Sequence, residues 1–181
     1  VDCGQYALAV ADYTQVLEGA EPTADLYRRR GAAWFLHGDY QAAVEDLTQS
    51  TQLQPKNFEA YFTLGAVFRR TQHLGAAVKA FRLALLSDPS KNQVMSAIVR
   101  SKHQICDWAE LDENNAYLSE LVTHGQTLEN PFSFLNITSD GRAQRLCAEF
   151  HSANELHGIS PLSAKPRQQR SKIRLGYASS D

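Results

Sequence analysis

Apolar side chains between residues 57 and 89 recur with the spacing of two amphipathic helices. Leu64 and Phe68 follow Tyr61 at intervals of three and seven positions, so these side chains share one face of a helix. A second apolar face follows a short polar break, and Pro89 ends it, because proline lacks the N–H that a helix interior needs. The pattern predicts a helical hairpin. The second face consists of Leu74, Ala77, Val78, Phe81 and Ala84.

The same pattern occurs 34 residues earlier in the chain. When the two segments are aligned with this offset, small residues align with small ones and large residues with large ones. This period resembles that of the tetratricopeptide repeat, whose helical hairpins stack into a solenoid. Within a unit, Gly65 is expected to face the small Ala77 of its partner helix and to let the two helices approach closely. The residues that coincide are Tyr27 with Tyr61, Gly31 with Gly65, Trp34 with Phe68, Ala43 with Ala77, and Leu47 with Phe81.

The repeat region is expected to extend over residues 1–108. Its first segment matches only the second half of a unit, which leaves an apolar face for a neighbouring repeat to cover and indicates a longer array. After Pro89 the 34-residue pattern fades into one closing helix, against which Cys106 and Trp108 are expected to pack. The predicted parts are a half repeat (1–22), full repeats (23–56 and 57–90) and the closing helix (91–108).

Residues 109–157 are predicted to form a helical connecting region. Its expected helices run from Leu111 to Thr123, with Gly125 as terminator, and from Arg142 to Leu156. Residues 158–171, rich in Gly, Ser, Pro and basic side chains, predict a linker. Residues 172–181 then alternate polar and apolar positions and predict one short β-strand, which needs a sheet to be stable.

Composition narrows the class of protein. A hydrophobic share of 43% and a net charge of −2 are typical of a soluble globular chain and give no basic field for nucleic acid. Cys3, Cys106 and Cys147 are too scattered for a disulfide framework, which favours a reducing cytoplasm. The sequence contains neither a secretory leader nor an apolar run of membrane-spanning length. We therefore expect a cytoplasmic protein with neither nucleic acid nor membrane as partner.

Three motifs that follow the two full repeats carry a more specific resemblance. They are the Cys-Asp-Trp segment at 106–108, Pro131-Phe132, and IRLGYASSD at 173–181. In this order, after a tetratricopeptide array, the motifs resemble the bacterial O-linked N-acetylglucosaminyltransferases related to the plant SPINDLY proteins. The resemblance covers the whole chain.

The resemblance implies that the parent protein transfers a sugar from a UDP-sugar to Ser or Thr of proteins. The terminal strand would then open a missing α/β, Rossmann-like catalytic domain, and Ser179, Ser180 and Asp181 would border its donor cleft. No complete catalytic set lies in this chain, so we expect the chain alone to bind no cofactor. For Ser179 and Ser180 in this chain alone, a turn that ends the strand is the alternative interpretation.

Protein or peptide partners are expected at the concave face of the repeats, which the first helix of each pair lines. This face can bind an extended peptide, be solvated, or be covered by the next domain. The corresponding second hypothesis for the whole chain is a non-catalytic tetratricopeptide scaffold. The groove candidates are Asp25, Arg28, Ala32, Phe35, Glu59, Phe62, Ala66 and Arg69.

Two other patterns have simpler explanations. His103 and Cys106 have metal-ligand spacing, but a zinc site needs about four ligands and no second pair lies near, so no metal site is expected. The basic side chains from Lys165 to Arg174 can attract phosphate, but without interleaved aromatic residues a solvated linker is the default interpretation.

Overall fold

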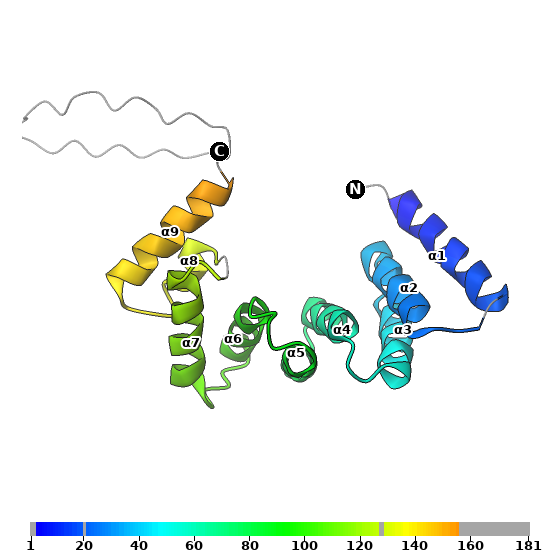
Figure 1. Cartoon of the computed structure of the whole chain (residues 1–181), viewed down its shortest axis with the longest axis horizontal. Coiled ribbons are helices and arrows are strands. Elements are labelled where there is room, and N and C mark those ends of the chain that lie inside the picture. The colour runs from blue at the N-terminus through cyan, green and yellow to red at the C-terminus, as the bar shows by residue number, and fades with distance from the viewer. Residues whose placement is uncertain (1–2, 20, 127–128, 156–181) are drawn as a thin grey trace, which may run out of the picture.

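The computed structural model describes residues 3–19, 21–126 and 129–155. Within these ranges the chain forms nine helices and no strand, which confirms an α-solenoid for this part of the chain. The helices follow an open arc, with α1 on one arm and α9 on the other (Figure 1). In chain order they are α1 (Cys3–Gly19), α2 (Ala24–His37), α3 (Tyr40–Leu53), α4 (Phe58–Arg70), α5 (Leu74–Ser87), α6 (Val94–Gln104), α7 (Leu111–Thr123), α8 (Pro131–Phe134) and α9 (Gly141–Glu155).

Helices α2 with α3, and α4 with α5, form the two predicted hairpins. The two helices of each hairpin pack on each other, and α3 packs on α4, so the hairpins stack in sequence order. Three of the four helices begin at a polar side chain that accepts a backbone N–H, as N-caps do. The caps are Thr23 accepting from Leu26, Asp39 from Ala42, and Asn57 from Ala60.

Helix α1 packs against α2, in the place of the second helix of a preceding unit. Val10 is buried in this contact, whereas Leu8 is 68% exposed and Val16 is 45% exposed. The expectation that a neighbouring repeat covers this apolar face stays a prediction.

The turns after α2, α4 and α6 share one backbone geometry. Gly38, Gln72 and Cys106 follow one another at 34-residue intervals and have φ values of 100°, 62° and 53°. In each turn, the N–H of this residue and of the next donate back to carbonyls in the last turn of the helix, which is a Schellman motif. The turn at Cys106 keeps the 34-residue interval of the two turns before it, and α6 contacts α7. Helices α6 and α7 therefore form a third helix pair.

The closing helix predicted over residues 91–108 corresponds to α6, which is shorter than predicted. Helix α6 ends at Gln104, and α7 begins only at Leu111. Six residues separate these helices, against three between α4 and α5, so the polypeptide turns back where the sequence pattern predicted continued helix.

Close packing inside the second hairpin centres on Gly65. The Phe81 ring lies against Gly65, and a Cβ at position 65 would come within 2.5 Å of two ring carbons. Ala77 is also fully buried and belongs, together with Phe81, to the core cluster that includes Val94 and Ile98 of α6. The prediction of a close approach at Gly65 is confirmed, with Phe81 as the nearest neighbour. The expected pairing of Gly65 with Ala77 stays a prediction.

Both helices predicted in the connecting region are present. Helix α7 has the expected bounds, and Gly125 follows it with φ of 67° in another Schellman turn. Helix α9 buries Ala143 and Cys147. The turn-rich stretch before it contains one short helix, α8, capped by the Asn130 side chain.

The predicted linker at 158–171 and the strand at 172–181 lie outside the described residues, as do Ser179, Ser180 and Asp181. Among the described helices, none is both long and apolar enough to cross a membrane.

Candidate peptide-binding groove

The first helix of each pair, α2, α4 and α6, lies toward the inner side of the arc (Figure 1). A hollow of about 360 Å³ lies between these helices, near their C-terminal ends. We call it the arginine groove. It is lined by Phe35, Ala66, Arg69, Arg70, Gln72, Arg100 and Gln104.

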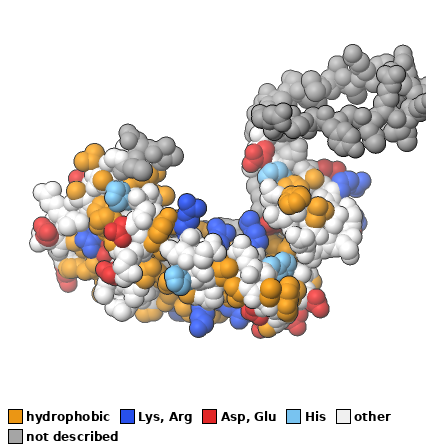
Figure 2. All heavy atoms as spheres, turned by 180° about the vertical axis from the view of Figure 1, so that it is seen from behind, with side chains coloured by type: hydrophobic (Ala, Val, Ile, Leu, Met, Phe, Trp, Pro, Cys, Tyr) orange, Lys and Arg blue, Asp and Glu red, His pale blue; other side chains and the backbone are white. Residues whose placement is uncertain are grey.

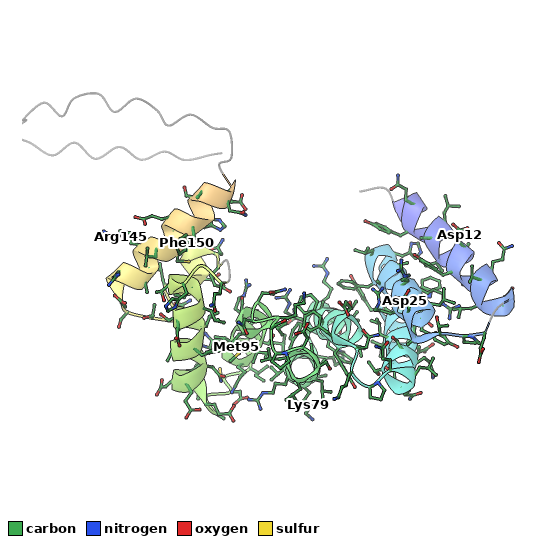
Figure 3. The ribbon with its side chains drawn as sticks, in the orientation of Figure 1. Asp12, Asp25, Lys79, Met95, Arg145 and Phe150 are labelled. Atoms are coloured by element: carbon green, nitrogen blue, oxygen red, sulfur yellow. The ribbon has the colours of Figure 1, made fainter. Side chains whose placement is uncertain are left out.

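The lining contains three arginines and no carboxylate. Within the described residues Arg69 has no ion-pair partner. The Nε of Arg70 donates to the hydroxyl of Tyr40 at 3.3 Å, a hydrogen bond that raises the pKa of Arg70. The space-filling view shows basic side chains along the inner edge of the arc, between the two arms (Figure 2). Lys79, by contrast, lies on the outer side of α5 (Figure 3).

Arg100 is positioned by groups beneath the groove. Its Nη2 donates to the Ser96 hydroxyl at 2.9 Å and lies 3.9 Å from a carboxylate oxygen of Glu129. Glu129 is only 3% exposed, and its other carboxylate oxygen has no hydrogen-bond partner in the described part of the chain. A buried carboxylate is unfavourable without a nearby cation, so Arg100 compensates Glu129 while its side chain remains 44% exposed at the groove.

Three of the predicted groove residues come together in this hollow. Phe35 from α2, and Ala66 and Arg69 from α4, all line it. The Phe35 ring also contacts that of Tyr40, with centroids 6.1 Å apart, so the aromatic wall of the groove is itself supported. Their part in binding a partner stays a prediction.

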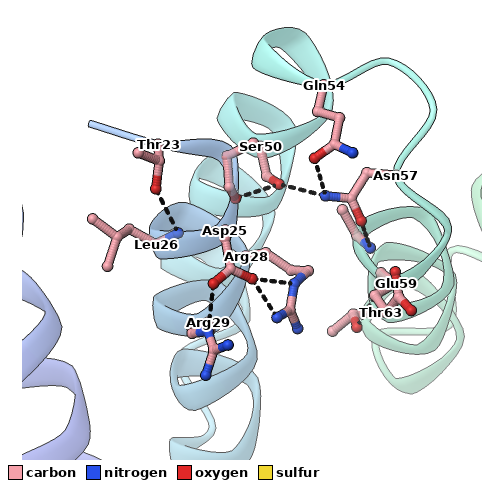
Figure 4. A network of polar contacts seen from close by, with 12 residues as sticks. Thr23, Asp25, Leu26, Arg28, Arg29, Ser50, Gln54, Asn57, Glu59 and Thr63 are labelled. Atoms are coloured by element: carbon pink, nitrogen blue, oxygen red, sulfur yellow. Dashed lines mark hydrogen bonds and ion pairs between the residues drawn. The ribbon is translucent and has the colours of Figure 1, made fainter. Parts of the chain in front are cut away.

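Asp25 and Arg28 lie elsewhere on the inner face and bind each other (Figure 4). The Asp25 carboxylate accepts from Arg28 and from Arg29, each at 2.6 Å. These hydrogen bonds, first that of Arg28 and then that of Arg29, lower the pKa of Asp25. The two arginines of this cluster are therefore already paired, unlike Arg69 of the arginine groove.

Glu59 and Phe62 do not line the hollow either. Phe62 stacks on Phe58 with centroids 5.7 Å apart and packs against Phe81 at the same separation. It is 37% exposed, so much of its surface serves helix packing rather than a ligand. Glu59 is exposed on the first turn of α4.

The sequence prediction missed four residues of the groove: Arg70, Gln72, Arg100 and Gln104. The signal for two of them was the repeat period itself. Arg100 stands 34 residues after the predicted Ala66, and Gln104 stands 34 after Arg70, which was itself missed but lies next to the predicted Arg69. Extending the register by one unit would have placed α6 on the inner face.

The Cys-Asp-Trp segment forms the turn between α6 and α7 and does not pack as predicted. Cys106 is exposed and Trp108 is 61% exposed, although the Trp108 ring approaches His103 at 6.2 Å between centroids. Lys102 fills the buried position instead, because its long stem reaches beneath the turn. In the described residues no group of three or more His, Cys, Asp or Glu side chains is placed to hold a metal ion.

Comparison with known families identifies the repeats. Two family models, both described as tetratricopeptide repeat, match residues 24–57 and 58–91, which correspond to the two hairpins. The chain therefore contains tetratricopeptide repeats.

Curated relatives match over the same region. The chain is 27% identical over 115 residues to small glutamine-rich tetratricopeptide repeat-containing protein 2 of Mycosarcoma maydis, covering 63% of this chain and 32% of the relative. It is 35% identical over 78 residues to the SGT1 homolog of Oryza sativa subsp. japonica, covering 43% of this chain and 21% of the relative. The chain thus spans a third or less of these relatives.

Solved structures share the fold at low sequence identity. A MamA structure superposes with a TM-score of 0.63 at 15% identity, covering 85% of this chain and 90% of that one. The tetratricopeptide protein YrrB superposes with a TM-score of 0.56 at 14% identity, covering 81% and 67%. The comparisons support the tetratricopeptide part of the resemblance, and the glycosyltransferase part stays a prediction.

Proposed function

We propose that the described repeats are a protein-interaction module whose arginine groove binds an acidic peptide segment of a partner. The observation that supports this function is the gathering of Arg69, Arg70 and Arg100 around one hollow that no carboxylate lines. Guanidinium groups present forked donors that match carboxylates, so acidic side chains are the natural complement.

The rest of the groove suits an extended peptide. Phe35 offers an apolar surface, and Gln72 and Gln104 offer amide groups that both donate and accept hydrogen bonds. Because the groove is open to solvent, its charge contacts are screened by salt, and we expect affinity to fall as ionic strength rises. YrrB, which shares the fold, is described as having an unusual peptide-binding site.

Selection from a random peptide library on the immobilised chain tests this function. We expect the enriched peptides to carry an excess of Asp and Glu and to lose roughly tenfold or more in affinity for Arg69→Glu. Arg69 suits this change because no ion pair among the described residues is broken by it.

The matched control is Lys79→Glu, which makes the same change in net charge on the outer side of α5 (Figure 3). It should leave the affinity unchanged. Enrichment of peptides without acidic excess, or equal losses for both variants, would contradict the proposal.

A second candidate function concerns the parent protein. The ordered motifs at 106–108, 131–132 and 173–181 favour a cytoplasmic protein O-glycosyltransferase that uses a UDP-sugar, with this chain as its repeat-containing region. Transfer of labelled N-acetylglucosamine from UDP-GlcNAc by the parent protein would support it. Calorimetry of this chain with UDP should show no binding, and micromolar affinity would contradict the assignment of the donor site to the missing domain.

A further inference from the structure

We infer that the arginine groove recognises a phosphorylated side chain, a phosphoserine or phosphothreonine within the peptide. This inference rests on the proposed function and specifies the ligand of the same groove. It starts from the arrangement of its three guanidinium groups.

The arginines reach the hollow from two sides. Arg69 and Arg70 come from the last turn of α4, and Arg100 comes from α6. Two groups therefore stand on one wall and one on the facing wall. A carboxylate has two oxygens and is satisfied by one guanidinium fork, whereas a phosphate monoester has three terminal oxygens that accept from several forks at once.

The local charge agrees with this ligand. Three arginines contribute three positive charges, and Glu129, 3.9 Å from Arg100, offsets one. The C-terminal ends of α4 and α6 each add a partial negative charge of about one half, so roughly one positive charge remains and the groove attracts anions. A phosphate monoester carries about −1.5 to −2 near neutral pH, so a net positive groove attracts it more strongly than one carboxylate of charge −1.

The buried Glu129 explains how Arg100 is kept in place for such a ligand. A free arginine side chain samples many conformations, and immobilising it on binding is unfavourable. The Ser96 hydroxyl and the Glu129 carboxylate hold Arg100 from beneath, while its exposed side remains available to the groove. The contrast is with Arg28 and Arg29, whose donors are engaged by exposed Asp25.

Phe35 gives the reason to expect a peptide rather than free phosphate. It lines the hollow beside the arginines and is half-buried, with part of its ring surface uncovered. An apolar residue next to the phosphorylated one can cover this surface, which a free anion cannot do.

The test is an NMR titration that follows the side-chain Nε–H signals of arginine in the whole chain. The probes are N-acetyl-phosphoseryl-leucine amide, the matched glutamyl and seryl dipeptide amides, and sodium phosphate. We expect the phosphoseryl probe to shift the signals of Arg69, Arg70 and Arg100, and to bind about fivefold or more tightly than any other probe. Arg69→Gln should weaken its binding by about fivefold, and Lys79→Gln should not.

The outcomes separate this inference from the function on which it rests. Equal affinity for the glutamyl probe would overturn phosphate recognition and leave acidic-peptide binding intact. Equal affinity for sodium phosphate would overturn the peptide origin of the phosphate. If the phosphoseryl probe shifts the signal of no groove arginine, the inference of phosphate recognition fails. The proposed function fails as well only if the peptides from the library selection also bind without these arginines.

Discussion

Gly65 of α4 lies directly against the ring of Phe81 in α5, so that the absence of a single methyl group sets the distance between the two helices. The same relation occurs one repeat earlier, where a Cβ on Gly31 would come within 2.8 Å of the Leu47 side chain. Both repeats therefore place a large side chain against a glycine, although the large residue differs between them.

Replacing Gly65 by Ala should lower the free energy of unfolding. The new methyl group would lie 2.5 Å from two ring carbons of Phe81, whose side chain is only 1% exposed. Overpacking of this kind is unfavourable by about 1–3 kcal/mol, and the better helix propensity of alanine offsets roughly 1 kcal/mol. Urea unfolding should show a net loss, and it should affect the neighbouring hairpins because each unit is stabilised by the next.

Gly75→Ala is the control for that substitution. Apart from its chain neighbours and the backbone of its own helix, no atom lies within 4 Å of the Cβ it would add, so only the propensity term remains and stability should rise by about 0.5 kcal/mol. Two variants with equal stability would show that the ring does not restrict position 65.

The sequence predicted this repeat because small and aromatic residues recur at a fixed interval, and packing requires them at those positions. The sequence-based prediction missed the third helix pair, α6 with α7, and the reason is again physical. Val99 stands in the register of Gly65, and Lys102 stands in that of Phe68, so side-chain type no longer marks the unit. The backbone keeps the turn at Cys106, because a left-handed residue after a helix depends on main-chain hydrogen bonds more than on side-chain identity.

The groove was predictable only in part for the same reason. Phe35 and Arg69 follow from the register of the two clear units, whereas Arg100 requires the third. The contribution of Glu129 is a contact between segments 29 residues apart, which no periodic pattern indicates.

Replacing Gln72 by Gly should raise stability. Gln72 has φ of 62°, a left-handed conformation that disfavours a side chain by roughly 1–2 kcal/mol, while glycine adopts it freely. The greater chain entropy of glycine in the unfolded state offsets about 0.4–1 kcal/mol of that gain. Thermal unfolding should show a small rise in midpoint. At exposed Gln49, inside α3, the same substitution should instead lower stability by about 1 kcal/mol, and losses at both positions would contradict the strain at Gln72.

The first three helices are joined by a paired arginine. Arg30 of α2 donates to both carboxylate oxygens of Asp46 in α3, at 2.7 and 2.8 Å, and to the Thr14 hydroxyl of α1 at 3.3 Å. The Asp46 side chain is 8% exposed and that of Arg30 is 20% exposed. Arg30→Met should therefore be strongly destabilising, by about 3 kcal/mol, because it leaves a buried carboxylate without its cation.

Asp46→Asn should be less destabilising, since Arg30 keeps some access to water and can still donate to the amide oxygen. The double variant, Arg30→Met with Asp46→Asn, should be more stable than the sum of the two single effects by at least about 1 kcal/mol. Urea unfolding of all four proteins measures this coupling. Strict additivity would mean that the pair contributes nothing to holding α2 on α3.

The last prediction concerns Lys102, a fully buried lysine beneath the turn between α6 and α7. Its ammonium donates to the Ala109 carbonyl and lies 3.8 Å from carboxylate oxygens of Asp107 and Glu110, so one cation holds both halves of the turn. Lys102→Met preserves most of the volume and removes the charge, which should lower stability by about 1.5–3 kcal/mol. Lys102→Ala should lower stability further, because a cavity then replaces the aliphatic stem of the lysine.

Hydrogen exchange separates the two effects. Both variants should speed exchange at the amides of Asp107 and Leu111. The additional loss of stability in Lys102→Ala should appear as weaker protection of the α5–α6 core. Unchanged exchange in the turn of Lys102→Met would show that the ammonium does not organise it.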